Sequence, residues 1–160
     1  MRALAGCELD KDVSSFDVFT GLWWPLRRKS QAAPRREVAW LIAKLYAAIP
    51  VPHLKSSNEK LTTLAQTVGR GEPHEDLAQK RFRRRFNLLL CNPLSGLEPH
   101  LRWALSVARQ EVVARHAMGI DWIQLTDHLS IWDKGEEHRL KRDIREIWAE
   151  QYLETSNKRN

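Results

Sequence analysis

The segment from Gln79 to Leu90 combines dense positive charge with apolar residues at helical spacing. Five of the six residues from Lys80 to Arg85 are cationic. The apolar residues fall at positions i, i+4, i+7 and i+8, which form one face of an α-helix: Phe82, Phe86, Leu89 and Leu90. This periodicity predicts a helix that packs against a core, and it argues against a disordered basic tail.

The remaining positions of this helix divide by direction, at about 100° per residue. Lys80, Arg81 and Arg84 are expected to point away from the apolar face, while Arg83 and Arg85 flank it. A helix anchored in this way holds positive charge in a fixed array, and a phosphate backbone is the partner that most needs such an array. The alternative is a solvated face whose arginines pair with acids elsewhere in the chain.

Composition places the chain among globular proteins. Its 160 residues suffice for one domain or two small ones, 42% are hydrophobic, and the formal net charge is +6, which attracts polyanions. No apolar run approaches the roughly 20 residues that span a bilayer, and the N-terminus lacks a signal-peptide pattern. Cys7 and Cys91 are isolated, which suits a reducing compartment. We therefore expect a cytoplasmic protein with no membrane partner.

Helical periodicity recurs along the chain, and no segment shows the alternation of a strand. The first expected helix runs from Ser14 or Ser15 to Leu26, and Pro25 kinks or ends it. A short helix from Leu61 to Val68 is expected to be capped within residues 56–59, and another to follow an Asp121 N-cap. The other expected helices are Glu37–Ala48, the basic helix to Cys91, Pro99 to Gly119, and Glu136–Leu153. The predicted fold is all-α, a compact helical bundle of about seven to eight helices. It forms either one continuous domain or two packed halves, residues 1–70 and 71–160.

Two further cationic clusters accompany the basic helix. One is Arg27-Arg28-Lys29, and the other is a stripe on the last expected helix, opposite Leu140, Ile144 and Trp148. A second stripe at helical spacing makes chance a poorer explanation of the first. The candidate nucleic-acid-binding residues are therefore Arg27, Arg28, Lys80, Arg81, Arg84, Arg85, Arg139, Arg142 and Arg145.

Motifs for catalysis, metals and cofactors are missing. No histidine or cysteine has zinc-ligand spacing, and the glycines of 69–73 lack the residues of a phosphate loop, so their expected role is a helix C-cap and turn. Glu98-Pro99-His100 and Asp127-His128 place acids near imidazoles, but adjacent helical residues point apart, so surface polarity is the expected role. The acids are scattered among bases, where a nuclease would need clustered carboxylates. We expect no catalytic residues, no metal and no cofactor.

The aromatic residues are expected mainly in the core. Four of the seven tryptophans lie on or beside apolar stripes: Trp40, Trp122, Trp132 and Trp148. Trp23 and Trp24 are adjacent and cannot both face one stripe, so one of them is a candidate for partner contact. Leu77 and Leu88 fall on the outward side of the basic helix, which suggests a protein contact.

Several short motifs occur together in a characteristic order: Leu26-Arg27-Arg28; Ala39-Trp40 with Leu45-Tyr46; Arg84-Arg85-Phe86 with Leu89-Leu90; His100-Leu101-Arg102; Gly119-Ile120-Asp121-Trp122; Leu129-Ser130-Ile131-Trp132-Asp133; and Trp148-Ala149 with Tyr152. In this pattern the chain resembles the CasB family, the small subunit of the type I-E CRISPR Cascade complex, over most of residues 16–153. The resemblance implies a non-enzymatic, all-helical subunit in antiviral defense. Its implied partners are guide RNA, target DNA including the displaced strand, other Cascade subunits and a second copy of itself.

The cationic clusters and the family motifs coincide at Arg27, Arg28, Arg84 and Arg85, which are the first candidates for backbone contacts. In such assemblies base pairing reads the sequence, and protein supplies contacts to the backbone. Two alternatives are a helix-turn-helix regulator and a structural scaffold subunit that binds acidic protein surfaces. A regulator needs polar base-reading residues at the start of a recognition helix, where the helix after Asp121 offers Trp122 and Ile123.

Overall fold

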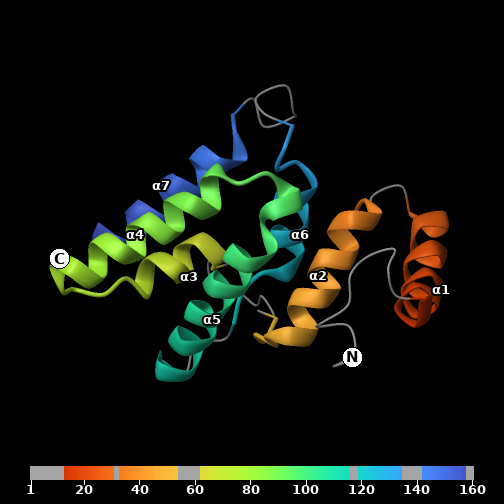
Figure 1. Ribbon diagram of the computed structural model, residues 1–160, viewed down its shortest axis with the longest axis horizontal. Helices are drawn as coiled ribbons and strands as arrows, with labels where there is room; N and C mark the ends of the chain where they lie inside the picture. The colour runs from red at the N-terminus through yellow and green to blue at the C-terminus, as the bar shows by residue number, and fades with distance from the viewer. Residues whose placement is uncertain (1–12, 31–32, 54–61, 116–118, 135–141, 158–160) are drawn as a thin grey trace. The chain divides into compact units, whose positions relative to one another are not determined.

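The computed structural model describes all residues except 1–12, 31–32, 54–61, 116–118, 135–141 and 158–160. Its described part contains seven α-helices and a 3₁₀ helix (Figure 1). The helices are α1 (Val13–Lys29), α2 (Arg36–Ala48), α3 (Leu64–Arg70), α4 (Asp76–Cys91), η2 (Leu94–Gly96), α5 (Glu98–Arg115), α6 (Trp122–Ser130) and α7 (Ile144–Asn157). The described residues form no sheet, only an isolated bridge between His53 and Ile120. The all-α prediction is confirmed.

Contacts between residues group the chain into two units, Met1–Pro50 and Val51–Asn160. The first unit contains α1 and α2, and the second contains α3 to α7. The boundary predicted between residues 70 and 71 falls inside the second unit, where α3 packs against α5 and α7.

The sequence predicts that Pro25 kinks or ends the first helix. Helix α1 does not end there but continues to Lys29. The last turns are tied to the chain that follows them. The Trp23 indole donates to the Pro34 carbonyl at 3.1 Å, and an Arg27 N–H donates to the Ala33 carbonyl at 2.7 Å. These bonds, together with the Ser30 N–H that donates to Leu26, hold helical backbone beyond the proline.

Helix α3 begins later than predicted because Thr63 caps it. The Thr63 hydroxyl accepts from the Gln66 N–H and the Gln66 side chain accepts from the Thr63 N–H, both at 3.1 Å, which forms a capping box. Its glycine Gly69 lies against α7, where a Cβ would stand 2.5 Å from the Tyr152 carbonyl oxygen. Gly71 is the C-cap residue, as predicted. The absence of a side chain at Gly69 therefore permits close packing of α3 on α7.

The starts of α6 and α7 are both defined by aspartates. Asp121 caps α6 as predicted, since its carboxylate accepts from the N–H groups of Ile123 and Gln124. Helix α7 begins at Ile144, where the Asp143 carboxylate accepts the Arg145 N–H at 2.9 Å, and residues 142 and 143 before it are not helical. The predicted N-terminal part of this helix lies largely outside the described residues.

The second unit has an aromatic core. Trp132 and Trp148 are each 1% exposed, and their rings meet edge to face at 5.1 Å between centroids. The Trp132 indole donates to the Asn92 carbonyl, and the Trp122 indole to the Val51 carbonyl. Trp40 is buried on α2 in the first unit. The core assignment of these four tryptophans is confirmed.

Candidate nucleic-acid interface

Helix α4 is anchored by the apolar face that its sequence predicts. Phe86 and Leu89 are 4% and 0% exposed, while Phe82 and Leu90 are half-buried. The Phe86 ring stacks on Tyr152 of α7 at 4.2 Å, and the Phe82 ring meets Trp103 of α5 edge-on at 5.0 Å. Helix α4 therefore lies against both α5 and α7, and its opposite face is free to carry charge.

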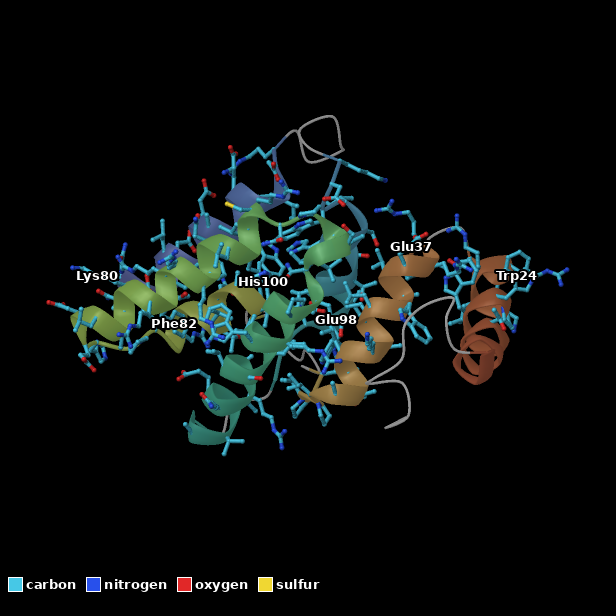
Figure 2. The ribbon with its side chains drawn as sticks, in the orientation of Figure 1. Trp24, Glu37, Lys80, Phe82, Glu98 and His100 are labelled. Atoms are coloured by element: carbon cyan, nitrogen blue, oxygen red, sulfur yellow. The ribbon has the colours of Figure 1, made fainter. Side chains whose placement is uncertain are left out.

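Three cationic side chains form the outer face of α4, as predicted: Lys80, Arg81 and Arg84. All three are exposed, and within the described part of the chain none of them has an ion pair or a side-chain hydrogen bond. Figure 2 shows Lys80 projecting outward from α4, with Phe82 on the side toward α5. We call these three residues the α4 ridge. Their unpaired charges are in a fixed helical array, which suits repeated phosphates.

Arg83 is adjacent to the ridge but serves the fold. Its Nε donates to the Glu72 carboxylate at 2.9 Å, and a terminal nitrogen lies 2.8 Å from the same oxygen. The other Glu72 oxygen accepts from the Tyr152 hydroxyl. Burial and the Glu72 carboxylate raise the pKa of Tyr152, which therefore stays protonated as a donor. Glu72 is 5% exposed, so Arg83 supplies the charge that a buried carboxylate needs.

Arg85 is exposed on the other flank of the ridge, toward α5. Its guanidinium carbon lies over the Trp103 ring, 5.5 Å from the centroid, within range of a cation–π interaction. The aromatic ring fixes the position of the side chain without neutralising its charge. Arg85 thus extends the positive surface of α4 toward α5.

The first cationic cluster is at the end of α1, where Arg27, Arg28 and Lys29 are all exposed. Arg27 is partly engaged by the Ala33 carbonyl. Of the two adjacent tryptophans, Trp23 is tied to Pro34 and Trp24 is 56% exposed. Trp24 is therefore the one placed for a partner contact. This cluster belongs to the first unit, and the α4 ridge belongs to the second.

The predicted C-terminal stripe differs from the expectation. Arg139 lies outside the described residues, and Arg142 precedes α7 instead of lying within a helix. Arg142 forms an ion pair with Glu150. Arg145 lies 3.1 Å from an Asp133 oxygen, with its guanidinium carbon over Trp132, 5.6 Å from the centroid. Both charges are therefore compensated within the chain, which makes them weaker candidates than the α4 ridge.

Two residues important for this surface were not found from sequence. Glu72 lies in a glycine-containing turn, and nothing in the sequence indicates that it is buried. Trp103 lies beside the apolar stripe of α5, and the helical spacing does not indicate its contact with Arg85. The exposed leucines are where the helical spacing placed them: Leu77 and Leu88 are 64% and 45% exposed. Together with Arg81 and Arg84 they follow the spacing i, i+4, i+7 and i+11, which is one outward stripe.

The acid–imidazole pairs separate in the structure. Glu98 pairs with Arg102 at 2.9 Å, while His100 lies 3.2 Å from the Asn92 amide nitrogen. His128 is half-buried and not a free surface side chain as expected, since its Nδ1 accepts from the Trp148 indole at 2.8 Å. Burial lowers the pKa of His128 from 6.5 to about 4, and a nearby Asp121 carboxylate only partly offsets it. His128 therefore acts as a neutral acceptor at the edge of the core.

Other kinds of site receive no support from the described residues. Among them, no three His, Cys, Asp or Glu side chains gather as a metal ion would require. No described helix is both long and apolar enough to cross a bilayer.

Comparisons with known proteins place the chain in a family. The family model of the CRISPR-associated protein Cse2 matches residues 1–153. Among solved structures, the fold matches the crystal structure of a CRISPR-associated protein of the Cse2 family from Thermus thermophilus. That match has a TM-score of 0.63 and 23% sequence identity, and it covers 95% of this chain and 84% of the other. A comparison with curated proteins finds no match. The chain belongs to the Cse2 family of CRISPR-associated proteins and is a Cascade-type subunit.

Proposed function

We propose that this protein is a non-catalytic subunit that binds the nucleic-acid backbone through the α4 ridge. In this role it stabilises the guide RNA–target DNA R-loop and the displaced strand without reading sequence. Membership of the Cse2 family supports a place in such a complex. The residues of the ridge supply the chemistry, since long cationic side chains on one helix face meet phosphates that repeat regardless of base.

The observation that carries the proposal is the contrast between arginines on α4. Arg83 forms an ion pair with the buried Glu72. The side chains of Lys80, Arg81 and Arg84 have no partner among the described residues. Three exposed positive charges close together on one helix face repel one another, and a bound polyanion would relieve that repulsion. Arg85, positioned by Trp103, and the separate cluster of Arg27 and Arg28 are secondary contacts.

The test is the salt dependence of binding to random-sequence DNA. Each neutralised phosphate contributes about −0.9 to the slope of log K against log salt for duplex, and about −0.7 for single strands. Four or more cationic contacts predict a slope steeper than roughly −2.5. Replacing Arg81 and Arg84 by Ala should flatten that slope by about one to two units. In the assembled complex the same change should weaken retention of target DNA and leave guide RNA binding by other subunits intact.

Arg142 supplies a control for the single replacement Arg84→Ala, because it is another exposed arginine that loses one positive charge on replacement by Ala. Because Glu150 pairs with it, Arg142→Ala should leave the salt slope unchanged. The proposal is wrong if the Arg81 and Arg84 double variant retains the wild-type slope. A sequence preference of orders of magnitude would instead favour the regulator. That alternative is weakened by α6, whose first residue Trp122 is buried.

A second candidate function is a scaffold that binds an acidic protein surface. It is favoured by Leu77 and Leu88, which flank Arg81 and Arg84 on the same exposed stripe. Exposed apolar residues at helical spacing are typical of a helix–helix contact. This candidate predicts weak binding to free DNA. It also predicts that Leu77→Ser with Leu88→Ser impairs assembly with other subunits while the salt slope remains unchanged.

A further inference from the structure

The contact between Arg85 and Trp103 holds a flat cation at a protein surface. Trp103 is a half-buried residue of α5, and Phe82 of α4 meets its ring edge-on at 5.0 Å. The guanidinium carbon of Arg85 lies 5.5 Å from the centre of that ring. Phe82 therefore helps to fix the indole, and the indole orients Arg85. The outward side of the Arg85 side chain stays exposed.

This arrangement is not needed to anchor α4. The helix is already held by Phe86 and Leu89, which are almost completely buried, and by the ion pair of Arg83 with Glu72. A surface arginine of purely electrostatic function does not require an aromatic ring beneath it. Planar guanidinium groups and aromatic side chains are, however, the surfaces on which unpaired bases stack.

We propose that Arg85 and Trp103 form a stacking platform for an unpaired nucleobase, beside the phosphate contacts of the α4 ridge. The inference rests on the proposed function and adds a selection for strandedness. A base from a single strand can stack on the guanidinium while its phosphates lie along Arg81 and Arg84. A duplex keeps its bases in its own stack and cannot use the platform. The ridge thus supplies salt-dependent affinity, and the platform supplies a term that salt does not change.

The experiment uses the full chain and two strands of equal length and charge, an oligodeoxythymidylate and a fully abasic strand. Stacking of one base contributes about 1–3 kcal/mol, so wild-type protein should bind the thymidylate at least about fivefold more tightly. Arg85→Lys keeps the charge but loses the plane. It should remove most of this difference while the salt slope remains the same. Trp103→Leu should do the same, and Trp103→Phe should retain most of the difference.

Arg142→Lys is the matched control, because it makes the same replacement at an exposed arginine that pairs with Glu150 and not with an aromatic ring, and it should keep the full difference. Thermal melting of each variant checks folding, and Arg85→Lys makes no change to the core. The platform is overturned if wild-type protein binds both strands equally, or if the variants weaken both strands equally. Either result with an intact salt slope leaves the proposed function standing. If wild-type protein bound neither strand, both the platform and the proposed function would be rejected.

Discussion

Arg83 and Arg84 are neighbours in α4 with opposite environments, so their replacement by Ala should separate stability from binding. Glu72 accepts hydrogen bonds from Arg83 and from the Tyr152 hydroxyl, and its side chain is 4% exposed. Arg83→Ala would leave a buried carboxylate with the tyrosine as its remaining partner. A hydrogen bond to a charged group contributes about 1.5–3 kcal/mol. The Arg83 side chain is 46% exposed, so solvent screening reduces the effect, and we expect a loss of about 2 kcal/mol.

Urea unfolding at neutral pH measures this loss, and for a chain of this size it corresponds to a decrease in Tm of about 4–8 °C. Arg84→Ala should remain within about 0.5 kcal/mol of wild type, because Arg84 is exposed and has no partner among the described residues. Adding Glu72→Gln to Arg83→Ala should recover part of the loss, since it removes the uncompensated charge. Equal stabilities of Arg83→Ala and Arg84→Ala would refute the reasoning. Their salt slopes should differ in the opposite sense, with the larger change in Arg84→Ala.

Two core positions give further predictions. Trp148→Ala should cost about 3–5 kcal/mol in urea unfolding, because the indole is 1% exposed and donates to His128; an unchanged unfolding midpoint would contradict its placement in the core. Gly69→Ala should lower stability by about 1–3 kcal/mol, because the new methyl group would lie 2.5 Å from the Tyr152 carbonyl oxygen. Gly21→Ala is its control, since the added Cβ meets no atom of the described residues within 4 Å beyond its own stretch of helix backbone, and it should be neutral or stabilising.

Prediction from sequence succeeds here where periodicity and capping agree. Asp121 is followed by apolar residues at helical spacing, so both the start and the buried face of α6 could be predicted. The apolar spacing that continues upstream of Ile144 led the prediction to run the last helix through residues 142 and 143, which are not helical in the structure. The observed start depends on the side chain of Asp143, which accepts the Arg145 N–H. Periodicity alone cannot detect a cap inside an apolar pattern.

The candidate site shows the same limit. The outward direction of Lys80, Arg81 and Arg84 follows from helical geometry and is confirmed by their exposure. The role of Arg83 does not follow, because its partner lies eleven residues away in a turn that only tertiary packing buries. The contact of Arg85 with Trp103 likewise depends on how α4 and α5 meet. A sequence therefore shows which charges face outward, while the fold decides which of them are already paired.

The environment of His128 predicts the direction in which folding stability changes with pH. Its Nδ1 accepts from the Trp148 indole, so protonation would remove the acceptor and place a charge on a half-buried side chain beside that indole. Burial lowers the folded-state pKa from 6.5 to about 4. As pH falls below 6.5, the unfolded chain takes up a proton that the folded chain does not. Stability should therefore be complete above pH 6.5 and decrease as pH falls toward 4, by about 2 kcal/mol between pH 7 and pH 5.

The control for this prediction is His128→Asn, whose amide oxygen takes the place of Nδ1 as acceptor and does not titrate. Urea unfolding of both proteins from pH 7 to pH 5 gives the difference in free energy at each pH. The other histidines and the carboxylates are common to both proteins, so their contributions cancel in that difference. The wild type should lose about 2 kcal/mol more than the variant over this interval. Parallel curves would mean that His128 is protonated equally in the folded and unfolded chains. That result is incompatible with a half-buried imidazole whose Nδ1 accepts the Trp148 indole N–H.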